Sequence, residues 1–329
     1  MLDAPADPLA TTPPRAAGSV RRTTSVDILR PDGMRGDVYL YGRARDVFTA
    51  RAGAAPEVIG EAELDARVAL RNRGLLSLQL RPDQPAAAGL IGRSVGAGFR
   101  AAIDPGLAGT PAAVLLDDLP VANLIAGYAA LRVDPTPGKP DFAKATAVHA
   151  AQGDICSGWR KDGAMMTMIA TEGIMPVPEC PSAPPLEDPA DPDGWHPMAA
   201  LPPTSMRRRR RIDVIPGDGD LLHVDATFRD SFWEPSGEEV VLHEYLLAAD
   251  VDRDGRIVQI EVEPRVLPWP ECPAAAASAE RLVGTTAEDL PDTVKQDLRG
   301  ISSCTHLNDL FRSLRDVHRL GARARELRS

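Results

Sequence analysis

The second half of the chain alternates between apolar and polar residues in a way that predicts β-strands. Residues 222–228 read Leu-His-Val-Asp-Ala-Thr-Phe, residues 240–251 are rich in β-branched and aliphatic side chains, and residues 256–263 alternate again. A period of two is typical of a strand with one buried face. Between the last two runs, Asp254-Gly255 indicates a hairpin turn, because glycine readily adopts the positive φ that such turns need. We therefore predict three antiparallel strands.

The segments after these strands have helical signatures. Residues 273–283 are rich in alanine, and Thr286-Ala-Glu-Asp289 resembles a capping box, in which side chains bind the free N–H groups at the start of a helix. A last helix is predicted to begin near Thr305, because the apolar residues after it recur at helical spacing and define one buried face. These residues are Leu307, Leu310, Phe311, Leu314, Val317 and Leu320. The predicted fold class is α+β.

The first half of the chain carries the same pattern as the second. Residues 73–82 match residues 254–264, and further matches follow at nearly constant spacing. They include Leu90-Ile91-Gly92 with Leu282-Val283-Gly284, and Asp118-Leu119 with Asp309-Leu310. Such spacing is the signature of an internal repeat. We predict two tandem copies of one α+β unit, each with a three-stranded antiparallel sheet packed by C-terminal helices.

The pattern divides the chain into four regions. Residues 1–18 are rich in Ala, Pro and Thr and are predicted to be disordered. Residues 19–130 form a degenerate repeat copy, residues 131–204 a proline-rich linker segment, and residues 205–322 the copy that carries the candidate site. Arginines fill positions 207–211, where the simplest interpretation is a solvated start of the second copy.

Length and composition narrow the possible functions. The 329 residues are enough for two domains with cores of their own, and 43% of them are hydrophobic. The net charge of −10 repels phosphate backbones, which argues against nucleic-acid binding. We find no apolar run long enough to span a membrane and no secretory signal at the start of the chain, so we expect a cytoplasmic protein without a membrane partner.

The candidate chemistry lies in the cysteines and histidines of the second copy. The four cysteines of the chain form no C-x-x-C pair, so they match neither a disulfide scaffold nor a zinc ribbon. Pro273 suits the first position of a helix, which makes Cys272 its predicted N-cap. The positive end of that helix would lower the pKa of the Cys272 thiol and favour the thiolate, the form that binds metals and attacks electrophiles.

We predict that four side chains converge on one metal ion. Two thiolates and two imidazoles would complete a tetrahedral site of the zinc type. The predicted ligands are Cys272, Cys304, His306 and His243. The first copy lacks all four: Ala62 corresponds to His243, Ala113 to Cys304 and Leu115 to His306, and the segment around Cys272 is missing. Their joint absence supports a shared site.

Other interpretations remain open at this point. A free cysteine is often a small buried apolar residue, and we favour packing for Cys156 and Cys180 in the linker. A thiol enzyme would use Cys272 as the nucleophile and His306 as the base. A structural or adaptor protein with a protein partner is the third possibility. The chain has no phosphate loop, serine elbow or paired-carboxylate motif, which favours a role without catalysis.

Several motifs of the second copy resemble a bacterial family of domains of unknown function. They are His243-Glu244, Glu271-Cys272-Pro273, Leu282-Val283-Gly284 and Cys304-Thr-His-Leu-Asn-Asp-Leu310. Shorter members of that family resemble a single copy. The family has no established activity, so this resemblance implies none.

A more distant similarity links the second copy to U-type iron–sulphur cluster scaffold proteins. In that family three cysteines, assisted by an aspartate or histidine, hold the nascent cluster. Cys272 and Cys304 match the middle and last of these cysteines, whereas the first falls at Val241 and its neighbouring aspartate at His243. The resemblance implies zinc, iron or an iron–sulphur cluster as the cofactor. The missing cysteine favours a mixed thiolate and imidazole site, to which His306 contributes.

Overall fold

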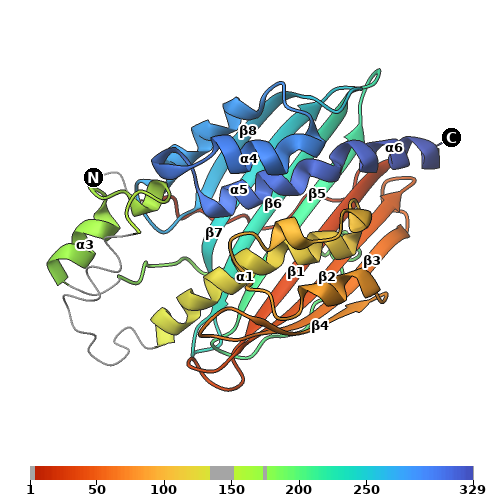
Figure 1. Cartoon of the computed structure of the whole chain (residues 1–329). Helices are drawn as coiled ribbons and strands as arrows, with labels where there is room; N and C mark the ends of the chain where they lie inside the picture. Colours follow the sequence, from red (N-terminus) through yellow and green to blue (C-terminus); the bar gives the residue numbers. More distant parts are fainter. Residues whose placement is uncertain (1–3, 134–151, 173–175, 329) are drawn as a thin grey trace.

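The alternating segments of both halves join in one antiparallel β-sheet. The computed structural model describes residues 4–133, 152–172 and 176–328. Its strands follow the order β4-β3-β2-β1-β5-β6-β7-β8, so the first strands of the two halves pair at the centre (Figure 1). The strands are β1 (Ser19–Leu29), β2 (Val38–Thr49), β3 (Glu57–Val68), β4 (Leu75–Arg81), β5 (Met206–Pro216), β6 (Leu222–Trp233), β7 (Glu239–Val251) and β8 (Ile257–Val266).

Helices cover one face of this sheet (Figure 1). Helix α1 packs on β2 and β3, and α6 packs where β1 and β5 meet. The α-helices are α1 (Pro111–Val133), α3 (Ala164–Glu172), α4 (Leu290–Asp297), α5 (Thr305–Ser313) and α6 (Val317–Arg328). The 3-10 helices are η1 (Pro85–Leu90), η2 (Arg100–Ala102), η3 (Pro105–Leu107), η4 (Ser157–Trp159), η5 (Cys272–Leu282), η6 (Ala287–Asp289), η7 (Gly300–Ser302) and η8 (Leu314–Asp316).

The α+β class is confirmed, but the number and arrangement of strands differ from the prediction. Each half contributes four strands, and both sets belong to one eight-stranded sheet. The three strands predicted in the second half are present as β6, β7 and β8. The strand that we missed there is β5, which contains the arginine run, and it joins the two halves by pairing with β1.

The interpretation of residues 207–211 as a solvated start is wrong. All five arginine side chains are buried in the central strand. A buried charge is tolerated when a partner compensates it, and each guanidinium contacts a carboxylate. The pairs are Arg207–Asp27, Arg208–Asp230, Arg209–Glu239, Arg210–Asp118 and Arg211–Asp213. Ion pairs therefore hold together a strand that has little apolar character.

The predicted last helix is confirmed in position and in burial. Helix α5 begins at Thr305, and the chain continues through η8 into α6. The five residues of the predicted stripe that we expected to face the sheet are buried in the core of the second half: Leu307, Leu310, Phe311, Leu314 and Val317. The 3.6-residue period thus identified the correct face.

Helix α1 corrects the statement that no apolar run could span a membrane. Its stretch Pro111–Ala129 is long and apolar enough to do so by length and composition alone. In the structure, 67% of that stretch is buried inside the protein. The apolar composition of α1 is therefore explained by its place in the core of the first half.

Segments that we expected to be irregular cover the other face of the sheet. Neighbouring residues on a strand point to opposite faces: Arg22 reaches Asp316 beside the helices, whereas Arg21 donates to the carbonyl oxygens of Pro13 and Gly194. Arg15 binds Asp191 at 2.7 Å, and both side chains are buried.

The expectation of disorder for residues 1–18 is therefore wrong for residues 4–18, and residues 1–3 lie outside the described part. The predicted linker falls partly on residues 134–151 and 173–175, which also lie outside it. Its last part is built into the fold, because Leu186, Trp195 and His196 are buried.

Candidate functional site

Asp230 enters the site from β6, where an arginine holds its carboxylate. That carboxylate accepts hydrogen bonds from Nε of Arg208 at 2.9 Å and from Nη2 at 3.3 Å. Nη1 of Arg208 also donates to Asp309 of α5 at 2.6 Å. The side chains of Arg208 and Asp230 are both completely buried. The guanidinium compensates the charge of Asp230 and fixes its orientation.

His243 lies directly beside Asp230 on the next strand. The ladder between β6 and β7 pairs these two residues, and a register shift follows immediately between Asp230 and Ser231. Residues that face each other in an antiparallel pair point to the same side of the sheet. Both side chains therefore lie under the helices. Tyr128 of α1 approaches the His243 ring edge-on, with 6.2 Å between ring centroids.

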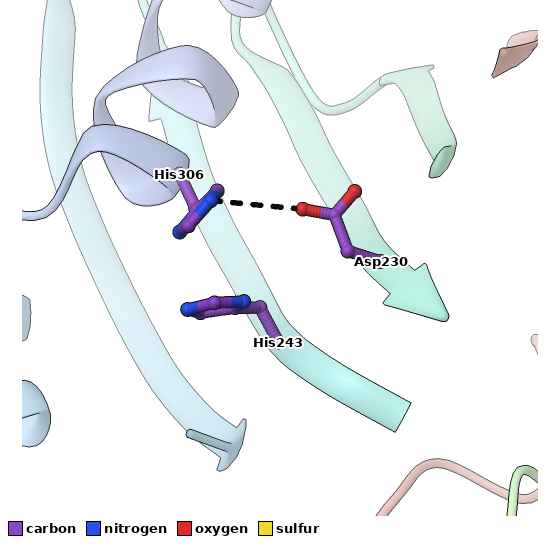
Figure 2. Close-up of side chains that lie close together, drawn as sticks. All are labelled: Asp230, His243 and His306. Carbon is purple, nitrogen blue, oxygen red and sulfur yellow. Dashed lines mark ion pairs between the residues drawn. The ribbon is translucent and has the colours of Figure 1, made fainter. Parts of the chain in front are cut away.

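His306 reaches the same point from the first turn of α5. Its ring lies over that of His243, with 3.7 Å between centroids and 42° between planes. Nε2 of His306 lies 3.9 Å from Oδ2 of Asp230. Figure 2 shows the three side chains meeting between the two strands and the helix. Two sheet residues and one helix residue, far apart in sequence, thus share one buried location.

These three side chains have the composition of a metal site. One possible ligand atom from each of Asp230, His243 and His306 lies within 4.8 Å of the other two, and all three residues are buried. Nδ1 of His243 and Nε2 of His306 have no hydrogen-bond partner among the described residues. Bonds of about 2.1 Å to a tetrahedral ion need ligand atoms about 3.4 Å apart. Since no two of these atoms are more than 4.8 Å apart, binding an ion would draw them together by at most about 1.4 Å.

Burial keeps both imidazoles neutral. Desolvation, followed by the positive charge of Arg208, lowers the pKa of His306 to about 3. The pKa of His243 is lowered well below its usual value, first by burial and then by the charges of His306 and Arg208. Neutral imidazole is the form that binds metals. Both rings therefore carry a free lone pair at neutral pH.

A cavity of about 270 Å³ adjoins the two histidines. Its walls come from α1, η4, the loop before η5 and the start of α5, so it is bounded by both halves and by the segment between them. All four predicted ligands line it. Its other walls include Tyr128, Trp159, Trp269 and a third cysteine, Cys156.

Cys272 differs from the prediction in both position and protonation. It is the first residue of η5, and Glu271 is the N-cap. Its pKa is raised well above the usual value, first by burial and then by the nearby Cys304 and Cys156. Burial therefore outweighs any effect of the helix start and favours the neutral thiol over the thiolate that we predicted. This weakens the case for Cys272 as an enzymatic nucleophile.

Cys304 is the N-cap of α5 and lies next to His306. Its Sγ is 4.0 Å from Nδ1 of His306. The pKa of the Cys304 thiol is raised, mainly by burial. Since Nε2 of His306 faces Asp230, the ring separates the carboxylate from this thiol. Nδ1 of His306 is the ring nitrogen that faces this thiol, and one ion shared by Cys272, Cys304, His306 and His243 stays a prediction.

The sequence did not show that Asp230 would lie beside the two histidines or that Cys156 would line the same cavity. Arg45-Asp46 in the first half matches Arg229-Asp230 in the second half of the sequence, and in the structure Asp46 pairs with Arg22 as Asp230 pairs with Arg208. The sequence match did not show that His243 would lie opposite Asp230 on the next strand. The linker around Cys156 has no motif spacing that would place Cys156 near the other cysteines.

The strand register also corrects one predicted correspondence. Gly60 lies opposite Asp46 as His243 lies opposite Asp230, so the counterpart of His243 is Gly60 and not Ala62.

The fold and these side chains define an α+β protein with a possible His and Asp metal-binding triad. Residues 206–319 match a family model described as "Protein of unknown function (DUF2889)". The matched region contains Asp230, His243, His306, Cys272 and Cys304, and it excludes Cys156 and the whole first half. No curated protein and no solved structure gives a significant match. The similarity to U-type scaffold proteins therefore stays a prediction.

Proposed function

We propose that this chain is a metal-binding protein whose second half holds a divalent transition-metal ion. The ligands are one oxygen of Asp230 and one nitrogen each of His243 and His306. The observation that carries the proposal is the convergence of these three buried groups, with an unpartnered nitrogen on each imidazole. Two imidazoles and a carboxylate suit zinc or ferrous iron, and both ions accept a further ligand at such a site.

The surroundings of Asp230 support a ligand role. Carboxylates that bind metals are themselves hydrogen-bonded, and Arg208 supplies those bonds here. Oδ1 takes the shorter of the two hydrogen bonds, from Nε of Arg208, which leaves Oδ2 as the oxygen that faces His306. The arginine thus presents one oxygen of the carboxylate to the imidazoles.

The first half has the same buried ion pair as the second half but lacks the two histidines. There, Arg22 and Asp46 form the corresponding ion pair at 2.7 Å. However, the position opposite Asp46 is Gly60, and the counterpart of His306 is Leu115. Because the ion pair occurs in both halves, we assign it a structural role. The two histidines occur only in the second half, and we assign them to metal binding. We infer that the first half is the degenerate copy and serves as a wall of the cavity.

The proposal is tested by metal analysis of protein purified without an affinity tag. Elemental analysis should find at least one zinc or iron ion per chain. His243→Ala and His306→Ala should each reduce that content strongly, because each removes one of three ligands. His223→Ala is the matched control, since His223 is exposed and bonds Asp250 at 2.6 Å. It should leave the metal content unchanged.

Two results would contradict the proposal. One is wild-type protein that stays metal-free after incubation with zinc and with ferrous iron followed by desalting. The other is equal metal content in the wild type and both site variants. Thermal denaturation of each variant shows whether it is folded, and only folded variants enter the comparison.

A further inference from the structure

Three cysteines from separate segments line one side of the cavity. Cys156 precedes η4, Cys272 begins η5, and Cys304 precedes α5. All three line an open space of about 270 Å³, and Cys272 and Cys304 lie where this space meets the core of the second half. The triad uses none of them. The fourth cysteine, Cys180, does not line this cavity.

Hydrogen bonds from one serine tie the three cysteine segments together. Ser157, next to Cys156, donates its backbone N–H to the carbonyl oxygen of Ser303 at 2.8 Å. Its hydroxyl donates to the carbonyl oxygen of Glu271. Ser303 and Glu271 are the residues directly before Cys304 and Cys272. Ser157 is fully buried, so its bonds fix the spacing of the three segments.

The position of the Cys272 sulphur atom requires a glycine at position 158. A Cβ atom built on Gly158 would lie 2.6 Å from Sγ of Cys272, closer than two such atoms can approach. Any larger residue at position 158 would therefore displace the thiol. Glycine at this point of η4 allows the Cys156 segment to approach Cys272.

We propose that Cys156, Cys272 and Cys304 form a separate site for a soft, thiophilic metal ion of the zinc type. Thiolates are the ligands that select such ions. Each metal–sulphur bond forms as one thiol loses its proton to solvent, so a divalent ion replaces up to three protons and leaves one net negative charge on the site. Nδ1 of His306 lies on this side of the ring, 4.0 Å from Sγ of Cys304. A neutral imidazole has one lone pair, so His306 is the fourth ligand here only when Nε2 carries the proton and does not bind the triad ion; otherwise a water molecule completes the site.

The three cysteine ligands of this site are not ligands of the triad. Asp230 and His243 belong to the triad only, and the three cysteines belong to the thiol site only. His306 faces both, with Nε2 toward Asp230 and Nδ1 toward Cys304. The two sites can therefore be tested by different variants of the same full-length chain.

The test is a titration of reduced, metal-free protein with Co²⁺ in the absence of oxygen. Thiolate ligands give cobalt an intense charge-transfer absorption in the near ultraviolet, whereas oxygen and nitrogen ligands do not. We expect this band in the wild type and a weaker band in Cys156→Ser, because one of three sulphur ligands is lost. Cys180→Ser is the matched control and should reproduce the wild-type spectrum.

X-ray absorption spectroscopy of the zinc-loaded wild type gives the ligands directly. Because the signal averages over all bound zinc, we expect zinc–sulphur bonds of about 2.3 Å that total three per chain, and two per chain in Cys156→Ser. This measurement needs no change in the wild-type chain, so a variant that misfolds does not prevent it. Absence of sulphur neighbours, or a count that Cys156→Ser leaves unchanged, would overturn the inference.

Variants of the triad distinguish the two proposals. Asp230→Asn and His243→Ala should keep the thiolate band of cobalt if the thiol site is independent. A band that persists while these variants bind as much metal as the wild type would refute the triad and leave the thiol site standing. Metal binding that depends on His243 without any thiolate band would refute the thiol site alone.

Discussion

The ion pair between Arg210 and Asp118 should be a large determinant of stability. Arg210 lies on β5 opposite Thr24 of β1, at the junction of the two halves. Its guanidinium donates to both carboxylate oxygens of Asp118 on α1, at 2.7 Å and 3.3 Å. Both side chains are buried, with exposed fractions of 2% and 3%. Asp118→Ala would leave a buried guanidinium without its main partner, which costs about 3 to 5 kcal/mol.

This loss should be visible in thermal denaturation. An unfolding entropy of about 2.1 cal/mol/K per residue gives about 0.7 kcal/mol/K for 329 residues, so the melting temperature should fall by about 4 to 7 °C. The double variant Arg210→Met with Asp118→Leu should recover most of the loss, because it removes both charges and keeps apolar volume.

An exposed ion pair provides the control. Glu63 binds Arg43, and both side chains are about half exposed, so Glu63→Ala should change the unfolding free energy by less than about 1 kcal/mol. If Asp118→Ala has an effect no larger than Glu63→Ala, the reasoning about buried pairs in β5 is wrong. A double variant that is less stable than either single variant would also refute it.

Two further predictions concern packing and pH. Leu310 is fully buried in α5, so Leu310→Ala should lower the unfolding free energy by about 2 to 5 kcal/mol in urea denaturation, and an unchanged midpoint would contradict its burial. His196 is buried between the hydroxyl groups of Thr23 and Ser25, and burial, then the charges of nearby arginines, lowers its pKa to about 3. The unfolded chain, with a pKa near 6.5, therefore binds a proton that the folded chain does not, and stability should fall by up to about 1.4 kcal/mol per pH unit as the pH drops below about 6.5. His196→Gln should reduce this dependence between pH 7 and pH 5, and an identical slope would show that His196 does not cause it.

The sequence predicted those parts of the fold that local periodicity controls. The alternation in residues 222–228 and the helical stripe after Thr305 were placed correctly, because each buries one regular face. The arginine strand could not be predicted in this way. Five consecutive charged residues have no apolar period, and their burial depends on carboxylates that come mostly from other elements. Such pairing depends on the tertiary structure.

The sequence predicted that four residues of the second half would lie near one another, and their role as ligands of one ion stays a prediction. His243, His306, Cys272 and Cys304 do line one cavity. Asp230 was missed because its role depends on the register of β6 against β7, which no local motif specifies. Cys156 was missed because a segment between the two halves folds back against the second half, and the sequence has no spacing that would show this.

The metal ion at the triad is the central claim, and anomalous X-ray diffraction tests it most directly. Crystals of the untagged protein grown with zinc would be measured on both sides of the zinc absorption edge. The account predicts an anomalous peak about 2.0 to 2.2 Å from a nitrogen of His243, a nitrogen of His306 and an oxygen of Asp230. A well-ordered site with no peak among these three side chains would contradict it.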